Sequence, residues 1–455
     1  MRLRNVKFQN HNENADRHLI AFALRWRPFY TPGDFTVTTS SNGLEKRPKL
    51  RFPGFDELWC SHKFSAVFSF LQNNTLSRAE LDATGDVLDI HYGDVLIKYG
   101  SILDATDNTI PHIISGHEST NYDYLQDGDI IVADTAEDKT VGKTIELLNI
   151  SGRKIEAGLH TVPCRPLFPF ASMYLGYYMN TPHYHKQLIP LMQGIKVLSI
   201  SKGNISKTEI SSPQTIAEQE KISRFLYLLD QRAAAQSKII DALKKYKRGV
   251  ISALLSSKTN PYYSSETWKE VALCDVASGF EYGMNAAATV YDGSHKYIRI
   301  TDIDDNSHLY SQDVPVSPEG QVDEKYRVRE NDILFARTGA SVGKSYCYQR
   351  SDGDLYYAGF LIRIHVNSDV NCGYVFQNTL TEAYRRWVLL ESARSGQPGI
   401  NAEQYKQYRF LLPPLELQNK ISTLATNLDN LICKEENLLS QIEQVKIALL
   451  QRLFI

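Results

Sequence analysis

The feature that constrains this sequence most is one long stretch in the middle of the chain, from Pro213 to about Ser256. Apolar residues recur along it at seven-residue spacing, and a second apolar row runs beside the first. This is the pattern of a long helix of coiled-coil type. The proline is tolerated in a first helical turn, because its missing N–H would be unpaired there in any case. A helix of this length in mid-chain must separate two flanking bodies.

The end of the chain, from Pro413 to Ile455, repeats this stretch. Gln219-Glu-Lys-Ile222 in the first helix corresponds to Gln418-Asn-Lys-Ile421 in the second, again after a proline. We expect the two helices to pack antiparallel, because the second body must return the chain to the start of the second helix. The predicted seam of this coiled coil consists of Ile222, Leu229, Gln236, Leu243, Val250, Ile421, Leu428, Glu435, Ile442 and Leu449.

Two polar residues, Gln236 and Glu435, interrupt the seam at equivalent positions of the two helices. Antiparallel packing would bring them to the same level of the coil. A polar pair there could fix the register at some cost in stability. Two solvent-facing residues are the alternative, and the sequence does not decide between them.

The duplication extends to the two bodies. Six anchors occur twice in the same order, and the offset between the copies falls steadily from 209 to 199 residues. This series implies a duplicated module of about 200 residues, a globular part followed by a helix. The anchor pairs are Trp59 and Trp268, Asp94 and Asp302, Asp129 and Asp332, Lys143 and Lys344, Ile200 and Ile400, and Ile222 and Ile421.

Within each body, short β-rich runs bounded by Gly, Asp or Asn alternate with helical stretches, so we predict an α+β fold for both. The matched positions are strand ends, turns and helix entries, whereas the segments between them differ almost completely. One scaffold with a pseudo-two-fold internal repeat would then carry two different readers. The predicted segments are an N-terminal extension 1–49, bodies 50–212 and 258–412, and helices 213–257 and 413–455.

Composition limits what the chain can bind. With 455 residues and 42% hydrophobic content it can bury two or more cores. A net charge of −2 excludes a generally basic nucleic-acid coat, so any DNA contact must come from local patches. The extension 1–49 carries nine Lys or Arg against four acidic residues. It is either a DNA-contacting arm or a loosely ordered leader, and we favour the leader.

The cysteine pattern and the hydropathy point to a reducing compartment. The six cysteines are far apart, without the spacing of a zinc site or a disulfide framework. No apolar run approaches the length that spans a bilayer, and the polar start lacks a signal-peptide core. We therefore interpret the chain as a soluble, cytoplasmic protein.

One motif could indicate catalysis. The sequence of a phosphate-binding loop is similar to Gly339-Ala-Ser-Val-Gly343-Lys344-Ser345, and the first half has a shorter matching turn, Gly142-Lys143-Thr144. A true loop has four residues between its glycines and leads into a helix, whereas here there are three and a strand is predicted to follow. A turn that brings Lys143 and Lys344 near a DNA phosphate and a plain hairpin are the other readings. Because no nucleophile, base or methyl-donor motif stands out, we predict a non-catalytic chain.

Two bodies, each closed by a proline-led Gln-x-Lys-Ile helix, resemble the DNA-specificity subunit of type I restriction-modification systems. Leu50-Arg-Phe-Pro-Gly-Phe55 with Trp59 is similar to the usual beginning of that family, and Thr75 to Glu80 with Ile90 to Asp94 is similar to a common variant of its first recognition domain. The resemblance covers roughly residues 50–455, and the extension before Leu50 departs from it.

The resemblance implies that the two bodies are target-recognition domains, each reading one half of a split, asymmetric sequence in double-stranded DNA. The two helices would form the spacer and a platform for two methyltransferase subunits, with restriction/translocase subunits as further partners. S-adenosylmethionine, ATP and Mg would then serve partner subunits, and this chain would hold no cofactor or metal. The alternative is a standalone DNA-modifying enzyme or NTPase that uses the Gly-Lys-Ser/Thr turns.

Candidate DNA contacts are polar or cationic residues in the turns that differ between the two halves. Arginine and glutamine suit bidentate contacts to guanine and adenine edges, and lysine suits phosphate. For each residue, a solvated surface role is the competing interpretation. The candidates are Tyr92, Lys98, Tyr99, Lys139 and Lys143 in the first half, and Arg299, Arg337, Thr338, Ser341, Lys344 and Gln397 in the second.

Overall fold

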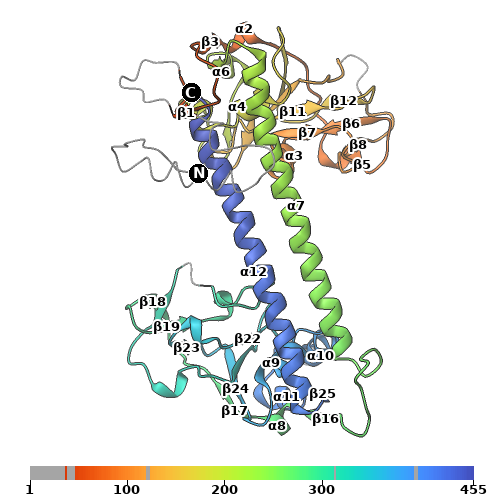
Figure 1. Cartoon of the computed structure of the whole chain (residues 1–455), viewed down its shortest axis with the longest axis vertical. Helices are drawn as coiled ribbons and strands as arrows, with labels where there is room; N and C mark the ends of the chain where they lie inside the picture. The colour runs from red at the N-terminus through yellow and green to blue at the C-terminus, as the bar shows by residue number, and fades with distance from the viewer. Residues whose placement is uncertain (1–35, 38–46, 119–122, 312–313, 394–397) are drawn as a thin grey trace, which may run out of the picture. The chain divides into compact units, whose positions relative to one another are not determined.

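The computed structural model describes residues 36–37, 47–118, 123–311, 314–393 and 398–455. It divides the chain into two compact units, residues 1–237 with 437–455 and residues 238–436. Each unit combines one globular part with portions of two long helices, α7 (Ile216–Leu254) and α12 (Leu415–Arg452), drawn in green and blue in Figure 1. The predicted extension 1–49 lies almost entirely outside the described residues.

The globular part of the first unit is built on two sheets, with strand orders β4-β13-β9-β11-β7 and β12-β6-β8-β5. The central strand β9 has the sequence Ile-Ile-Val-Ala, and all four residues are buried, as expected for β-branched side chains inside a sheet. The strands of the two sheets are β4 (Phe68–Phe70), β5 (Leu81–Asp82), β6 (Val87–Ile90), β7 (Ile102–Asp104), β8 (His112–Ile113), β9 (Ile130–Ala133), β11 (Thr144–Leu148), β12 (Lys154–Ala157) and β13 (Thr161–Pro166).

Short helices and two-stranded ladders complete this unit. The ladders are β1 (Thr36–Val37) with β2 (Leu50–Arg51), β3 (Cys60–Lys63) with β15 (Glu209–Ser212), and β10 (Thr135–Ala136) with β14 (Leu198–Ser199). The helices are α2 (Phe64–Val67), η1 (Arg78–Glu80), α3 (Tyr92–Ile97), α4 (Tyr174–Tyr178), α5 (Pro182–Leu188), η2 (Ile189–Leu191) and α6 (Lys202–Ile205).

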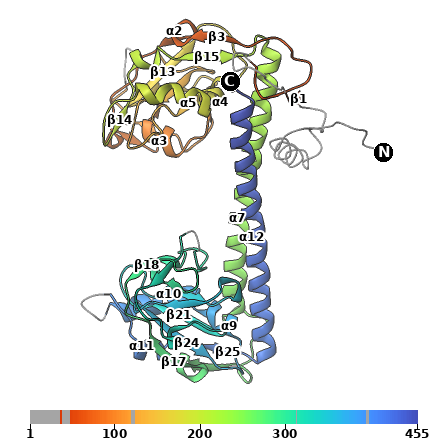
Figure 2. The same ribbon diagram turned by 90° about the vertical axis from the view of Figure 1, so that its left-hand side faces the viewer.

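The second unit has a four-stranded sheet of order β17-β24-β21-β22 and three two-stranded ladders, β16-β25, β18-β20 and β19-β23 (Figure 2). Its elements are β16 (Lys269–Ala272), α8 (Leu273–Val276), β17 (Ala277–Tyr282), β18 (Ala288–Val290), β19 (Lys296–Ile298), η3 (Ile300–Asp302), β20 (Val316–Pro318), η4 (Glu324–Tyr326), β21 (Asp332–Ala336), β22 (Ser345–Cys347), η5 (Arg350–Asp352), β23 (Leu355–Tyr357), β24 (Leu361–Val366), α9 (Cys372–Asn378), α10 (Glu382–Ser392), α11 (Ala402–Lys406) and β25 (Arg409–Leu412).

The two units share one pairing pattern. β12 lies parallel to β6 in the first unit, and β23 lies parallel to β19 in the second. The antiparallel series β13-β9-β11 corresponds to β24-β21-β22, and the pair β3-β15 corresponds to β16-β25. These correspondences confirm the predicted α+β class and the internal repeat.

The long helices contact each other within each unit. In the second unit, Lys247 pairs with Asp429 (2.6 Å) and Lys244 with Glu436 (2.6 Å). Residue numbers on α12 thus rise from one pair to the next while those on α7 fall. The two helices therefore run antiparallel there. In the first unit Lys446 pairs with Asp230, which is the repeat equivalent of the Lys247–Asp429 pair.

Every predicted seam residue is buried or half-buried. Gln236 is fully buried in the first unit, and Glu435 is half-buried in the second. Their pairing stays a prediction, because the two residues belong to different units.

The Gln-x-Lys-Ile entry has a physical explanation in both units. Gln219 accepts a hydrogen bond from the amide of Ala171 (2.9 Å) and donates to the carbonyl of Pro213 (3.0 Å). Gln418 accepts from the amide of Asn371 (2.9 Å) and donates to the carbonyl of Pro413 (2.7 Å). We call each arrangement a glutamine bridge. It ties the start of a long helix to the segment that precedes α4 or α9.

A buried ion pair adds a second tie in the first unit. Arg51 binds both carboxylate oxygens of Glu218, at 2.7 and 2.8 Å, and the two side chains are 3% and 1% exposed. The hydrogen bond with Glu218 raises the pKa of Arg51. The Leu-Arg-Phe sequence at residues 50–52 is thereby anchored to α7.

Three absences hold for the described ranges. No helix there is long and apolar enough to cross a membrane. Nor does that part of the chain bring three or more His, Cys, Asp or Glu side chains together as a metal site would. The six cysteines, all within the described residues, form no disulfide.

Candidate nucleic-acid interface

The two Gly-Lys turns are structural. Gly142 and Gly343 have positive φ values of +89° and +85°, and a Cβ would come within 2.4 Å of Leu188 in the first case and 2.6 Å of Val388 in the second. Glycine is thus required both by the backbone conformation and by the close approach of α5 or α10. Each turn leads into a strand, β11 or β22, and not into the helix that a phosphate-binding loop needs.

The lysines of these turns are bonded internally. Lys143 donates to the carbonyls of Leu96 (2.8 Å) and Tyr99 (2.9 Å) at the end of α3, and burial lowers its pKa. Lys344 donates to the carbonyl of Ile303 (2.9 Å) just after η3 and pairs with Asp305. A cation is favourable beside carbonyls that a helical turn leaves unpaired. In this conformation both lysines bind carbonyls within the chain, and their contact with DNA phosphate stays a prediction. The turns lack the helix that the nucleotide-loop alternative requires.

Several other predicted contacts also have internal partners. Tyr99 is buried in the core of the first unit, and burial raises the pKa of its hydroxyl. Lys98 is exposed but donates to the carbonyl of Thr109. Arg299 binds both oxygens of Asp302, at 2.8 and 2.7 Å.

Two further candidates in the second half are Ser341 and Gln397. Ser341 is half-buried, and its carbonyl accepts from the amide of Lys344 (3.0 Å) inside the turn. Gln397 lies outside the described residues, so its predicted role stays a prediction.

Among the candidates of the first unit, Tyr92 lies on what we call the first rim, which consists of Tyr92, Asp134, Thr135 and His160. The ring of Tyr92 lies against that of His160, with centroids 5.2 Å apart. Asp134 Oδ1 accepts from the Thr135 hydroxyl (2.8 Å) and lies 3.3 Å from Nδ1 of His160. These residues come from the start of α3, the end of β9, β10 and the β12–β13 turn.

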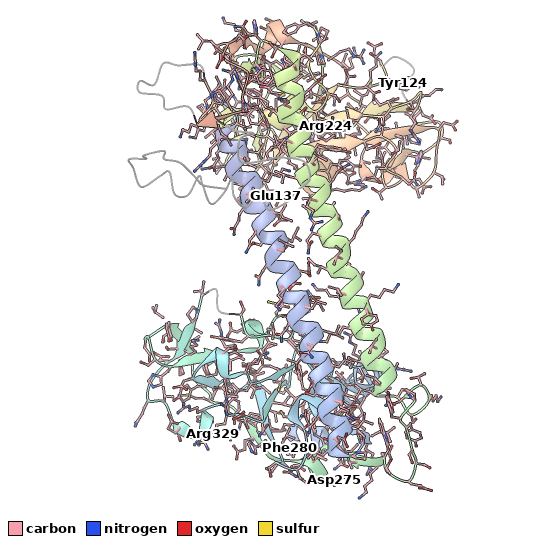
Figure 3. The ribbon with its side chains drawn as sticks, in the orientation of Figure 1. Tyr124, Glu137, Arg224, Asp275, Phe280 and Arg329 are labelled. Atoms are coloured by element: carbon pink, nitrogen blue, oxygen red, sulfur yellow. The ribbon has the colours of Figure 1, made fainter. Side chains whose placement is uncertain are left out.

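Two loops border the first rim. The loop between β10 and β11 begins at Glu137, labelled in Figure 3, and carries the exposed Lys139. The segment before β14 contains Ile195, which is 99% exposed, and the exposed Lys196.

The second unit has a counterpart, the second rim: Tyr282, Arg337, Thr338 and Phe360. The guanidinium of Arg337 stacks on the ring of Tyr282 at 4.7 Å, and Phe360 is 62% exposed. Tyr282 ends β17, the strand on which Figure 3 labels Phe280. Arg337 and Thr338 directly follow β21, as Asp134 and Thr135 follow β9.

The backbone hydrogen bonds of the two rims are the same. The amide of Asp134 donates to the carbonyl of His160 (3.0 Å), and that of Arg337 donates to the carbonyl of Phe360 (3.1 Å). The carbonyls of Asp134 and Arg337 each accept from an isoleucine amide, Ile200 at 2.8 Å and Ile400 at 2.9 Å. The rims therefore share a framework and differ in side-chain chemistry, acidic and imidazole in one, guanidinium and phenyl in the other.

Of the eight rim residues, the sequence named Tyr92, Arg337 and Thr338 as candidates and missed Asp134, Thr135, His160, Tyr282 and Phe360. The signal for Asp134 and Thr135 was present. The anchor pair Asp129 and Asp332 has an offset of 203, and continuing it five residues along the chain aligns Asp134 with Arg337. The other positions need the strand pairing, which the sequence does not give.

Comparisons with known proteins give a matching family model and similar proteins. Residues 265–444 match the family model of the type I restriction modification DNA specificity domain. The StySPI type I restriction enzyme specificity subunit of Salmonella potsdam is 22% identical over 298 residues, which are 62% of this chain and 64% of that protein. A putative type I restriction enzyme MjaX specificity subunit of Methanocaldococcus jannaschii is 24% identical over 200 residues, or 42% of this chain and 46% of that protein. The alignments thus span less than two thirds of either relative.

Solved structures show the same fold over most of the chain. The S subunit of a type I restriction-modification system from M. genitalium has a TM-score of 0.53 at 14% identity, covering 90% of this chain and 99% of that one. A chain from a structure on complex assembly and conformational transition of the type I R-M system has a TM-score of 0.53 at 14% identity, covering 87% and 97%. These likenesses confirm the predicted fold, and the family match over residues 265–444 agrees with the resemblance found in the sequence.

Proposed function

We propose that this chain, which carries a type I restriction modification DNA specificity domain in residues 265–444, is the sequence-reading subunit of a type I restriction-modification complex. It would recognise a bipartite, asymmetric target in double-stranded DNA and position the methyltransferase and restriction subunits. It would itself be non-catalytic and act in the cytoplasm.

The observation that carries the proposal is the pair of rims. Two units that share a core of strand pairings and the same rim hydrogen bonds carry different side chains at equivalent positions. Sequence in DNA is read by side chains on base edges, whereas a common scaffold only positions them. Two different side-chain sets on one duplicated scaffold are what reading two different half-sites requires.

The long helices support the platform role in this proposal. Each unit holds its portions of α7 and α12 by a glutamine bridge and by a repeat-equivalent Lys–Asp pair. Equivalent surfaces occurring twice would suit two copies of one partner, the methyltransferase subunit. S-adenosylmethionine, ATP and Mg would then be bound by the partner subunits.

The test is to purify the tagged chain from its native host, weigh the native complex, and assay methyl transfer to host DNA that lacks the modification. We expect two methyltransferase subunits per chain, and activity that requires both components. Methyl transfer by the pure chain alone, or a chain that purifies without any methyltransferase, would contradict the proposal.

A further inference from the structure

Arg337 stands apart from the other half-buried arginines in the described part of the second unit. Three of them bind carboxylates: Arg299 with Asp302, Arg327 with Asp354, and Arg363 with Glu281. The guanidinium of Arg337 has no carboxylate partner within the described residues, and its Cζ lies over the ring of Tyr282, 4.7 Å from the centroid.

The surroundings of Arg337 fix the guanidinium and leave its edge available. The hydroxyl of Tyr282 accepts from the amide of Ala402 (3.2 Å), which holds the ring in place. The amide and carbonyl of Arg337 are bonded to Phe360 and Ile400. Stacking occupies the face of the guanidinium, whereas its N–H donors point along the edge. A partly desolvated guanidinium whose donors have no partner in the described part of the chain can offer them to an acceptor on a ligand.

The acceptor that fits this geometry is the guanine edge. A guanidinium fork donates two parallel hydrogen bonds to O6 and N7 of guanine in the major groove. The phenyl ring of Phe360, 62% exposed beside it, offers an apolar surface to the neighbouring base. Phosphate would also accept from a guanidinium, but it requires no fixed plane.

The equivalent position in the first unit has the opposite chemistry. Asp134 uses Oδ1 for the Thr135 hydroxyl and for Nδ1 of His160. Its Oδ2 has no hydrogen-bond partner among the described residues. A carboxylate can only accept, and the base edge that matches it in the major groove is the N4 amino group of cytosine.

We propose that the equivalent positions 134 and 337 determine specificity, with Asp134 reading a cytosine in one half-site and Arg337 reading a guanine in the other. The inference rests on the proposed function and extends it to named residues and bases. Tyr282 and His160 are positioning residues, since they hold the reading groups through stacking and through a polar contact.

The test is selection of targets from a randomised duplex library by the full chain in its native complex, followed by sequencing. With Arg337→Gln, we expect the preference at one position of one half-site to move from guanine toward adenine, with guanine bound about 5- to 150-fold more weakly. Arg337→Lys should lose the guanine preference while the dependence of binding on salt stays the same. With Asp134→Asn, one position of the other half-site should relax.

Two exposed residues give matched controls. Arg350→Gln and Asp123→Asn make the same chemical changes away from the rims and should leave both half-sites unchanged. Circular dichroism melting confirms that each variant is folded.

The outcomes separate the inference from the proposed function. A wild-type complex that enriches no sequence would refute the proposed function. A wild-type complex with a defined target, together with Arg337 variants that weaken all sequences equally or alter both half-sites, would overturn this inference and leave the proposed function standing.

Discussion

The glutamine bridge of the first unit makes a sharp prediction about stability. Replacing Gln219 by leucine keeps the size of the side chain but removes both of its hydrogen bonds. The amide of Ala171 and the carbonyl of Pro213 would then lose their partner at a site where Gln219 is 3% exposed. The first unit should therefore be destabilised.

The magnitude follows from those two groups. A buried donor or acceptor left unpaired costs about 1–3 kcal/mol, and the added apolar burial of leucine offsets part of it. We expect a net loss of about 2–4 kcal/mol for Gln219→Leu. With a urea m-value of about 3 kcal/mol/M, the unfolding midpoint should fall by about 1 M.

Hydrogen exchange resolved to peptides across a urea series measures each unit separately. Gln231→Leu is the matched control, because Gln231 is exposed on the same helix in the same unit. Gln418→Leu should produce the same loss in the second unit, since its bridge has the same geometry. Equal midpoints for Gln219→Leu and Gln231→Leu would refute the reasoning.

Three further predictions follow from individual contacts. Gly343→Ala strains the backbone and makes the new Cβ clash with Val388, so it should lower the free energy of urea unfolding by about 2–4 kcal/mol. Gly339→Ala, with φ +76° and open space around it, should lower it by only about 1–2 kcal/mol. Similar losses would show that the close approach of Val388 to Gly343 is unimportant. Burial raises the pKa of Asp89 to about 7, so the contribution of this carboxyl to the free energy of unfolding, on the order of 4 kcal/mol, is fully present below the unfolded pKa near 4 and is lost as pH rises to about 7. Asp89→Asn should flatten the decline in the free energy of unfolding measured from pH 4 to 8. An unchanged slope would contradict this prediction. Lys344→Met should lower the stability of the second unit by about 1–2 kcal/mol because the carbonyl of Ile303 loses its donor. Calorimetric titration with Mg–ATP should give no heat for the wild-type protein or for this variant. Heat that depends on the lysine would restore the nucleotide-loop interpretation.

Much of the fold was available from the sequence because the repeat is a strong constraint. A proline-led helix with a seven-residue apolar spacing, occurring twice, predicts two long helices and two bodies without any tertiary information. The drifting offset between anchors predicts one scaffold used twice. The strand order was not predictable, since the pairing of β4 with β13 or of β12 with β6 joins segments more than sixty residues apart.

The interface was predicted less well, for a physical reason. A lysine in a glycine turn looks the same in sequence whether its ammonium meets a phosphate or the carbonyls at a helix end. Lys143 and Lys344 do the latter, and only the strand pairing brings α3 and η3 under their side chains. Arg337 and Arg299 are likewise indistinguishable in sequence, but the second is neutralised by Asp302 and the first is not.

The most direct test of two independent readers is an exchange of one of them. Residues 258–412 would be replaced by the corresponding block of a relative, and the methylated sequence in host DNA would be mapped for the resulting complex. We predict that one half of the target changes while the other half is retained. A complex that still methylates DNA but with both halves altered, or with neither altered, would contradict the assignment of one reader to each unit.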